Sequence, residues 1–282
     1  KNVIYDELMS VELATLENLR LIGKFFDEAT AIATVEFVGL REHELNSITD
    51  SLVAMNLELE TFAAVAAHDL RSPTATIIGF ADLIVDEQDQ EQDHSAEVAV
   101  MAVNTIKKTA HRMLELIDQL LGYAKIGKEH LARTTFSLKI IASEAKENLT
   151  AQIQDSKAIV NIKDLPDYSG DAVLFCQLFQ NLISNSLKFK AKDRTSEIVI
   201  AGTQEKGRIR LHVKDNGLGF DPKLSEIIFQ PFERGDQRTG VQGSGLGLAT
   251  AKKIVELHGG TIRAIGKVDE GAEVIIDLPT VH

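Results

Sequence analysis

Residues 66–73 read AAHDLRSP and place His68 directly beside Asp69, with Ser72 and Pro73 about one helical turn further along. The apolar residues before this stretch recur every three or four positions, which predicts a helix with an apolar stripe at Leu45, Ile48, Leu52, Met55, Leu59, Phe62 and Ala66. His68 falls off that stripe, so we expect its imidazole to face solvent, where a nitrogen lone pair is available near neutral pH. Proline removes a helical hydrogen bond, so we expect a bend just after His68 that allows two arrangements around it.

The composition indicates a globular protein without disulfide bonds. The chain has 282 residues, of which 44% are hydrophobic, and a formal net charge of −12, which argues against a general nucleic-acid binder. Cys176 is the single cysteine, as is typical of the reducing cytoplasm. No apolar run reaches the roughly 18 residues of a membrane span, so we expect no membrane contact by this chain. Because it begins at Lys1 rather than Met, we expect a fragment whose sensor or anchor lies upstream.

The first half predicts a coiled coil that leads into a helical hairpin. An early stripe runs from Leu19 to Ala33, and the interval from Ala33 to Leu45 breaks the heptad register, which predicts a local change of winding. The polar run DEQDQEQD, residues 86–93, predicts the hairpin loop. A second stripe follows at Ala99, Val103, Ile106, Ala110, Met113, Ile117, Leu120 and Ala124. Two such helices cannot bury both stripes alone, so we expect two copies to form a four-helix bundle. An ordinary bundle without a signalling role remains an alternative.

The pattern changes near residue 130 to alternating strands and helices. Strand patterns occur at 159–162, 197–201, 208–213, 261–265 and 272–278, and helix patterns at 139–156, 171–188 and 247–258. This order predicts an α/β sandwich with one mixed sheet and helices on one face. We therefore expect a coiled coil or the end of a sensor region at 1–55, a dimerising hairpin at 56–130, and an α/β domain at 131–282.

Two stretches in the second half predict a site for a metal and phosphate. In NLISNSLKF, residues 181–189, Asn181 and Asn185 lie four apart on one helix face and offer neutral oxygen ligands of the kind that Mg²⁺ accepts, with Lys188 one turn on. Taken alone, the two asparagines are more readily explained as polar positions on an amphipathic helix. GSGLGLA, residues 243–249, combines glycines with a helix start, which favours contact of loop amides with an anion.

Two further stretches complete the candidate ligand site. DNGLGFDP, residues 215–222, follows a strand pattern, and its Asp215 can accept a hydrogen bond from an exocyclic amine of a base; a plain turn is the alternative. IFQPFERGDQRTGVQ, residues 228–242, predicts a hinged lid whose phenylalanines serve as packing anchors.

Taken together and in this order, NLISNSLKF, DNGLGF, IFQPFERG and GSGLGLA resemble the N, G1, F and G2 boxes of sensor histidine kinases, and AAHDLRSPTATIIGF resembles their H box. The resemblance covers about residues 55–280. It implies a dimeric four-helix bundle followed by a mixed-sheet ATP-binding domain of the Bergerat type, which is shared with gyrase, Hsp90 and MutL.

The resemblance also implies roles for individual residues. His68 would accept the phosphoryl group, Asp69 would orient the ring, and Ser72 stands where relatives often carry Thr or Asn, which leaves phosphatase activity open. The implied ATP-binding residues are Asn181, Asn185, Lys188, Asp215, Gly217, Gly219, Arg234, Gly243, Gly245 and Gly247, with Asn185 and Asn181 on Mg²⁺. The segment GAEVIIDLP, residues 271–279, departs from the usual Gly-Thr-x-Phe and lacks a hydroxyl near adenine.

The expected function is therefore ATP-dependent autophosphorylation on His68, followed by transfer to an aspartate on the receiver domain of a separate response regulator. A phosphatase-dominant or scaffold module that binds ATP is one alternative. An ATP-driven clamp is another, disfavoured because such enzymes use a glutamate where this chain has Asn181.

Overall fold

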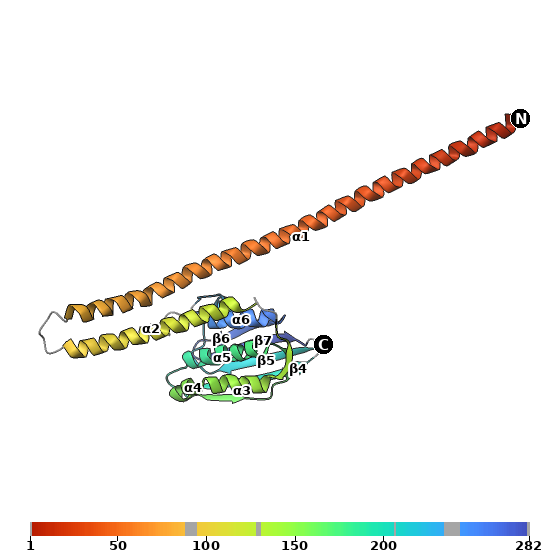
Figure 1. Ribbon diagram of the computed structural model, residues 1–282. Helices are drawn as coiled ribbons and strands as arrows, with labels where there is room; N and C mark the ends of the chain where they lie inside the picture. Colours follow the sequence, from red (N-terminus) through yellow and green to blue (C-terminus); the bar gives the residue numbers. More distant parts are fainter. Residues whose placement is uncertain (1, 88–94, 128–130, 206, 234–242, 281–282) are drawn as a thin grey trace. The chain divides into compact units, whose positions relative to one another are not determined.

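The computed structural model describes residues 2–87, 95–127, 131–205, 207–233 and 243–280. Helix α1 spans Asn2–Glu87 and α2 spans Ser95–Lys125 (Figure 1). The predicted loop at 86–93 falls mostly outside the described residues, as do the side chains of the early stripe and those of Leu52, Met55, Leu59 and Phe62. By contact density the chain divides into two units, residues 1–64 and 65–282.

The stripe predicted on α2 is visible in the burial of its side chains. Seven of its eight members are at least partly buried, whereas Val103 is exposed. The hydroxyl oxygen of Thr74 on α1 lies 3.9 Å from the sulfur of Met113 on α2, which places the two helices side by side at that level. Several apolar side chains of α2 remain exposed in the single chain, among them Val100, Met101, Leu114 and Leu121. No helix within the described ranges carries an apolar stretch sufficient to cross a bilayer.

The α/β part contains one mixed five-stranded sheet. Its strands are β2 (Ile159–Ile162), β4 (Glu197–Glu205), β5 (Arg208–Asp215), β7 (Gly271–Pro279) and β6 (Thr261–Lys267), in that order across the sheet. The β2–β4 pair is parallel and the others are antiparallel. Each strand appears where the sequence predicted one, and β4 to β7 are longer than expected. The predicted fold class is thereby confirmed.

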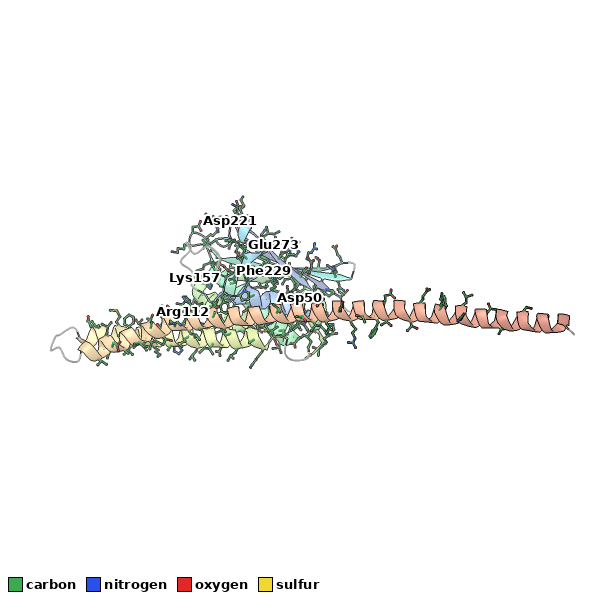
Figure 2. The ribbon with its side chains drawn as sticks, turned by 90° about the horizontal axis from the view of Figure 1, so that it is seen from above. Asp50, Arg112, Lys157, Asp221, Phe229 and Glu273 are labelled. Carbon is green, nitrogen blue, oxygen red and sulfur yellow. The ribbon has the colours of Figure 1, made fainter. Side chains whose placement is uncertain are left out.

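Three helices cover one face of this sheet: α3 (Leu138–Asn148), α5 (Ala172–Lys188) and α6 (Gly247–Leu257) (Figure 1). The interior between the layers is formed largely by fully buried side chains, including Phe175, Phe179, Ile200, Leu211 and Ile254. Phe229, labelled in Figure 2, is also buried, in a smaller apolar cluster with Ile228 and Ala264. Its role as a packing anchor agrees with the sequence interpretation.

Two details differ from the sequence expectation. The helix expected at 139–156 is divided into α3 and α4 (Thr150–Ser156), because the Thr150 hydroxyl donates to the Glu147 carbonyl at 2.6 Å and competes with the helical bonding pattern. A two-stranded sheet of β1 (Thr134–Ser137) and β3 (Asp167–Gly170) was not predicted, since each strand has only four residues. Short 3₁₀ turns, η1 (Pro222–Leu224) and η2 (Ile227–Phe229), follow β5.

Candidate functional site

His68 lies on α1 with its imidazole in solvent. Its side chain is 78% exposed, that of Asp69 is only 15% exposed, and Nδ1 of His68 lies 3.2 Å from Oδ1 of Asp69. A carboxylate accepts a hydrogen bond, so this contact assigns the ring proton to Nδ1 and leaves the lone pair on Nε2. The sequence therefore predicted both the exposure and the pairing correctly.

The turn after His68 contains Ser72 and Pro73, and the helix continues through both of them to Glu87. Ser72 is exposed, and its carbonyl accepts from the Thr76 hydroxyl at 3.1 Å. Thr74 donates in the same way to the Leu70 carbonyl at 2.7 Å. These side-chain bonds supply the helix with contacts in the turn where proline lacks its N–H. The bend expected at Pro73 stays a prediction.

Asp215, at the end of β5, is held by donors from three directions. Its Oδ1 accepts from the backbone N–H of Gly217 at 2.9 Å and of Ala272 at 3.2 Å, while Oδ2 accepts from the Ser186 hydroxyl at 3.0 Å. Burial raises the pKa of the Asp215 carboxyl, and these three donors oppose that shift without cancelling it. The carboxyl is thus oriented in advance and is poor in water, which suits the recognition of a single amine hydrogen.

Glycine is required beside Asp215 for steric reasons. A Cβ on Gly217 would lie 2.5 Å from the Phe189 carbonyl oxygen, and a Cβ on Gly219, whose φ is +62°, would overlap the Lys267 carbonyl oxygen. Gly271, with a φ of +104°, would overlap the Asp215 carbonyl oxygen in the same way. Gly271 was not predicted as a site residue, although a glycine directly before a strand pattern was the available signal.

Arg194 fixes the loop that follows Asp215, and no sequence motif pointed to it. Its guanidinium donates to the carbonyls of Asn216 at 2.7 Å, Gly217 at 2.9 Å and Asp269 at 2.5 Å. The side chain of Asn216 bonds in turn to the backbone of Thr195 and Glu197. One arginine therefore ties its own segment to two others, at residues 216–217 and at Asp269, around the carboxylate. Ser186, which also supports Asp215, was missed because a serine on a helix has no distinguishing pattern.

Helix α5 carries the two candidate metal ligands. It begins at its N-cap Asp171, whose carboxylate accepts from the amides of Val173 and Leu174. Asn181 and Asn185 are half-buried on this helix. Within the residues that the structure describes, no cluster of three or more His, Cys, Asp or Glu could hold a metal. Paired amide oxygens fit Mg²⁺ that keeps waters and nucleotide oxygens as its remaining ligands.

Lys188 brings the end of α5 to the glycine-rich loop. A Cβ on Gly243 would overlap its ammonium nitrogen, so the absence of a side chain at residue 243 makes room for this charge. Gly245, with a φ of +73°, contacts Phe232, whose N–H donates to the Gly245 carbonyl at 3.1 Å. Gly247 begins α6, and a Cβ there would meet no atom within 4 Å, so sterics do not require glycine at this position. Arg234 lies outside the described residues.

The ligand residues are linked through the end of α5. The Phe189 N–H donates to the Asn185 carbonyl at 3.0 Å, and the Phe189 carbonyl accepts from Leu218 at 2.9 Å, which joins the asparagine-bearing helix to the Asp215 loop. Together these elements place a buried carboxylate, two amide oxygens and an ammonium on connected backbone. That set can recognise a base amine, a divalent cation and a phosphate.

Two family models match separate parts of the chain. Residues 58–129 match the His Kinase A (phospho-acceptor) domain. Residues 170–282 match the histidine kinase-, DNA gyrase B-, and HSP90-like ATPase family. The matched ranges include His68 in the first and Asp215 in the second.

Individual relatives give the same result. The chain is 31% identical over 271 residues to the phytochrome-like protein Cph1 of Synechocystis sp., covering 95% of this chain and 36% of that protein. It spans about a third of the length of the first curated relatives that it matches. Among solved structures, histidine kinase ThkA in complex with the response regulator protein TrrA is similar with a TM-score of 0.59 at 23% identity, over 78% of this chain and 61% of that one. Full-length ShkA in complex with AMPPNP is similar with a TM-score of 0.53 at 22% identity, over 79% of this chain and 46% of that one.

Proposed function

The chain belongs to the sensor histidine kinases, and from this premise we propose that it transfers the γ-phosphoryl group of ATP to His68. One observation carries the proposal: an exposed imidazole has its Nδ1 3.2 Å from a shielded carboxylate, in a chain that also has an ATPase-family lobe. This pairing leaves Nε2 as the nucleophilic atom.

The transfer involves the His68 ring, ATP and the Asp69 carboxylate beside the ring. Nε2 of His68 attacks the γ-phosphorus in line, an N–P bond forms, and the bond from phosphorus to the bridging oxygen of ADP breaks. The ring becomes positively charged as its lone pair is used, and the adjacent Asp69 carboxylate balances that charge. Asp69 is therefore a positioning residue that acts through the imidazole.

The nucleotide would be held by the residues described on the lobe. Asp215 would accept from the adenine amine, Lys188 would contact the phosphates, and Asn185 with Asn181 would bind Mg²⁺. Bound Mg²⁺ neutralises negative charge on the transferred phosphate. Gly217 and Gly219 would shape the base site by letting the Asp215 loop pack against the carbonyls of Phe189 and Lys267. Gly243 would leave room for the Lys188 ammonium, and Gly245 would pack against the backbone of Phe232.

The partners follow from the chemistry. An N–P bond is labile, so the phosphoryl group can pass to an aspartate of a separate response regulator. The exposed apolar residues of α2 would be covered in a homodimer. Exposed Ser72, one turn after His68, would orient a water for the reverse dephosphorylation of the regulator, which keeps a phosphatase-dominant module as the second candidate.

Labelling distinguishes these activities. The purified chain is incubated with γ-labelled ATP and Mg²⁺, and the label on protein is then tested for stability in acid and in base. We expect acid-labile, base-stable label that disappears in His68→Ala and persists in the matched control His111→Ala, an exposed histidine on α2. Retention of the label in His68→Ala contradicts the proposal. Release of free phosphate without protein label indicates an ATP-driven clamp, and nucleotide binding with neither outcome indicates the phosphatase or scaffold module.

A further inference from the structure

Strand β2 forms one edge of the five-stranded sheet. The N–H groups of Ile159 and Lys163 donate to the carbonyls of Ser196, just before β4, and of Ile200 on β4, each at 2.8 Å. In a parallel pair the alternate residues turn their backbone groups the other way, so Val160 and Ile162 direct theirs away from β4. Val160 is only 5% exposed and Lys146 covers its carbonyl, so this edge can accept one more strand only when the Lys146 side chain moves away.

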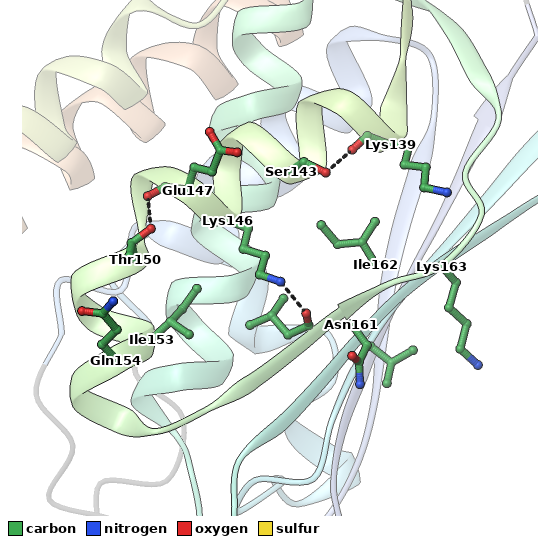
Figure 3. A pocket seen from close by; sticks show the side chains of 12 residues that line it. Lys139, Ser143, Lys146, Glu147, Thr150, Ile153, Gln154, Asn161, Ile162 and Lys163 are labelled. Atoms are coloured by element: carbon green, nitrogen blue, oxygen red, sulfur yellow. Dashed lines mark hydrogen bonds between the residues drawn. The ribbon is translucent and has the colours of Figure 1, made fainter.

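A groove of about 1080 Å³ runs along this edge, between β2 and helices α3 and α4 (Figure 3). Its floor is apolar and includes Ile153, Val160 and Ile162. Its walls carry polar groups such as Ser143 and Gln154. An extended peptide presents alternating side chains and a row of backbone groups, which is the combination that such a groove accommodates.

The charges around the groove are mainly positive. Three lysines line it, Lys139, Lys146 and Lys163, against one acid, Glu147, in a chain whose net charge is −12. Lys146 donates its Nζ proton to the Val160 carbonyl at 2.9 Å (Figure 3). Lys139 pairs with Asp164 at 3.1 Å, but that carboxylate is fully exposed, so the pair is easily exchanged for another carboxylate.

We propose that this groove binds an extended acidic segment of a partner protein, which adds to β2 as a further strand. The partner's carboxylates contact Lys139, Lys146 and Lys163, and its backbone pairs with Val160 and Ile162. Lys146 leaves the Val160 carbonyl for a carboxylate, and a backbone N–H of the partner takes its place. A second copy of β2 is a poor occupant, because it would bring these lysines close to their own copies. The groove is lined by none of the residues assigned above to nucleotide binding.

The rival explanation is that the lysines only protect the edge from pairing, which is a common use of lysine at sheet edges. The two explanations differ in what happens when an acidic strand is supplied. Protection alone predicts that no strand binds to the native chain and that removal of Lys146 causes self-association.

The test uses the full chain and the synthetic peptide acetyl-EVETEVE-amide, with acetyl-KVKTKVK-amide and the strand-breaking acetyl-EVEPEVE-amide as comparisons. Binding is followed by the exchange of the Val160 and Ile162 amide protons and by titration of a fluorescent peptide. We expect the acidic peptide alone to protect both amides. The double variant Lys139→Gln, Lys163→Gln should weaken its binding by about tenfold, since two charge contacts are lost. The matched control Lys223→Gln, at an exposed position outside the groove, should bind unchanged.

Several results would overturn the proposal: no protection of the two amides by the acidic peptide, equal binding of the lysine peptide, or an equal effect of Lys223→Gln. Self-association of Lys146→Gln without peptide binding to the native chain would establish edge protection instead. The labelling of His68 should be retained in the groove variants, so this test and that of the proposed kinase activity can fail independently.

Discussion

The two carboxylates of the candidate site, Asp69 and Asp215, are held in opposite ways. Asp69 lies on a long helix, where it pairs with its sequence neighbour, a histidine that is 78% exposed. Asp215 is partly buried at a strand end, and its three donors, from Ser186, Gly217 and Ala272, come from three segments of the chain. Asp69 is thus held by a contact within one helix, whereas Asp215 is held by contacts between distant segments.

Substitutions should therefore have larger effects around Asp215 than around Asp69. A helix satisfies its backbone locally, so its residues depend little on distant parts of the chain. The lobe fixes its ligand groups through contacts between distant segments, so that one added methyl group or one lost donor affects the whole site.

The largest expected contrast is between two glycines. Gly219→Ala should destabilise the lobe by at least about 2 kcal/mol, because the new Cβ overlaps the Lys267 carbonyl and φ is +62°. Gly79→Ala on α1, where nothing lies within 4 Å, should instead favour the helix by about 0.5–1 kcal/mol. Thermal unfolding measures both. Comparable losses in the two variants would show that the helical part is constrained as tightly as the lobe.

Asp215→Asn should separate ligand binding from stability. Its amide can retain the bonds to Gly217, Ala272 and Ser186, but it presents N–H groups to the adenine amine, so ATP affinity should fall by about ten- to a hundredfold. Isothermal titration measures this, with Asp221→Asn as the matched control. An unchanged ATP affinity in Asp215→Asn would remove Asp215 from the base site.

The pH dependence of Asp215 has a definite sign. Because its folded pKa is raised, the stability it contributes is present at low pH and is lost as pH rises through that pKa. At neutral pH the native carboxylate therefore costs stability, and Asp215→Asn should unfold at a higher temperature than the native chain. ATP affinity of the native chain should fall as the Asp215 carboxylate takes up a proton. This fall should begin at a higher pH than it would for an aspartate with an ordinary pKa.

Arg194→Lys tests the tie between three backbone segments. A single ammonium cannot reach the carbonyls of Asn216, Gly217 and Asp269 in the same fork geometry, so we expect a loss of about 1–3 kcal/mol and weaker ATP binding. The neighbouring exposed Lys192→Gln should leave both unfolding temperature and affinity unchanged. If Arg194→Lys behaves like that control, the loop is held by its glycines and by Asn216 without the guanidinium.

The smallest expected effect concerns His258, a buried histidine in the core. Its Nδ1–H donates to the Ile254 carbonyl at 2.7 Å and its Nε2 accepts from the Asp171 N–H at 3.1 Å, so both nitrogens are used by the neutral ring. Burial lowers the pKa of this imidazole. The stability that the neutral His258 ring contributes is therefore fully present above the unfolded pKa of about 6.5, and it decreases as pH falls below that value.

Denaturant unfolding of the native chain between about pH 7 and pH 5 should show this decrease, and His258→Gln should show less of it. His111→Ala, at an exposed position, should follow the native profile. If His258→Gln loses as much stability as the native chain between these pH values, the acid sensitivity of unfolding belongs to other groups.

The boxes around His68, Asn185 and Asp215 could be read from the sequence because each is a short local pattern. Arg194 and Ser186 could not, since their partners lie far along the chain, whereas the position of Gly271 before a strand pattern was a signal that was not used. The roles of the predicted site residues and the domain boundaries at residues 55 and 130 stay predictions.

The spacing of apolar residues predicted the long helices, the five sheet strands and the exposure of His68, because helix and strand periods are local properties of the chain. The fold was needed to show that Arg194 ties three segments together, that Lys188 occupies the space beside Gly243, and that β2 leaves an edge lined by lysines. Those arrangements depend on which distant segments meet when the sheet and its helices bury their apolar faces, and no local pattern records that meeting.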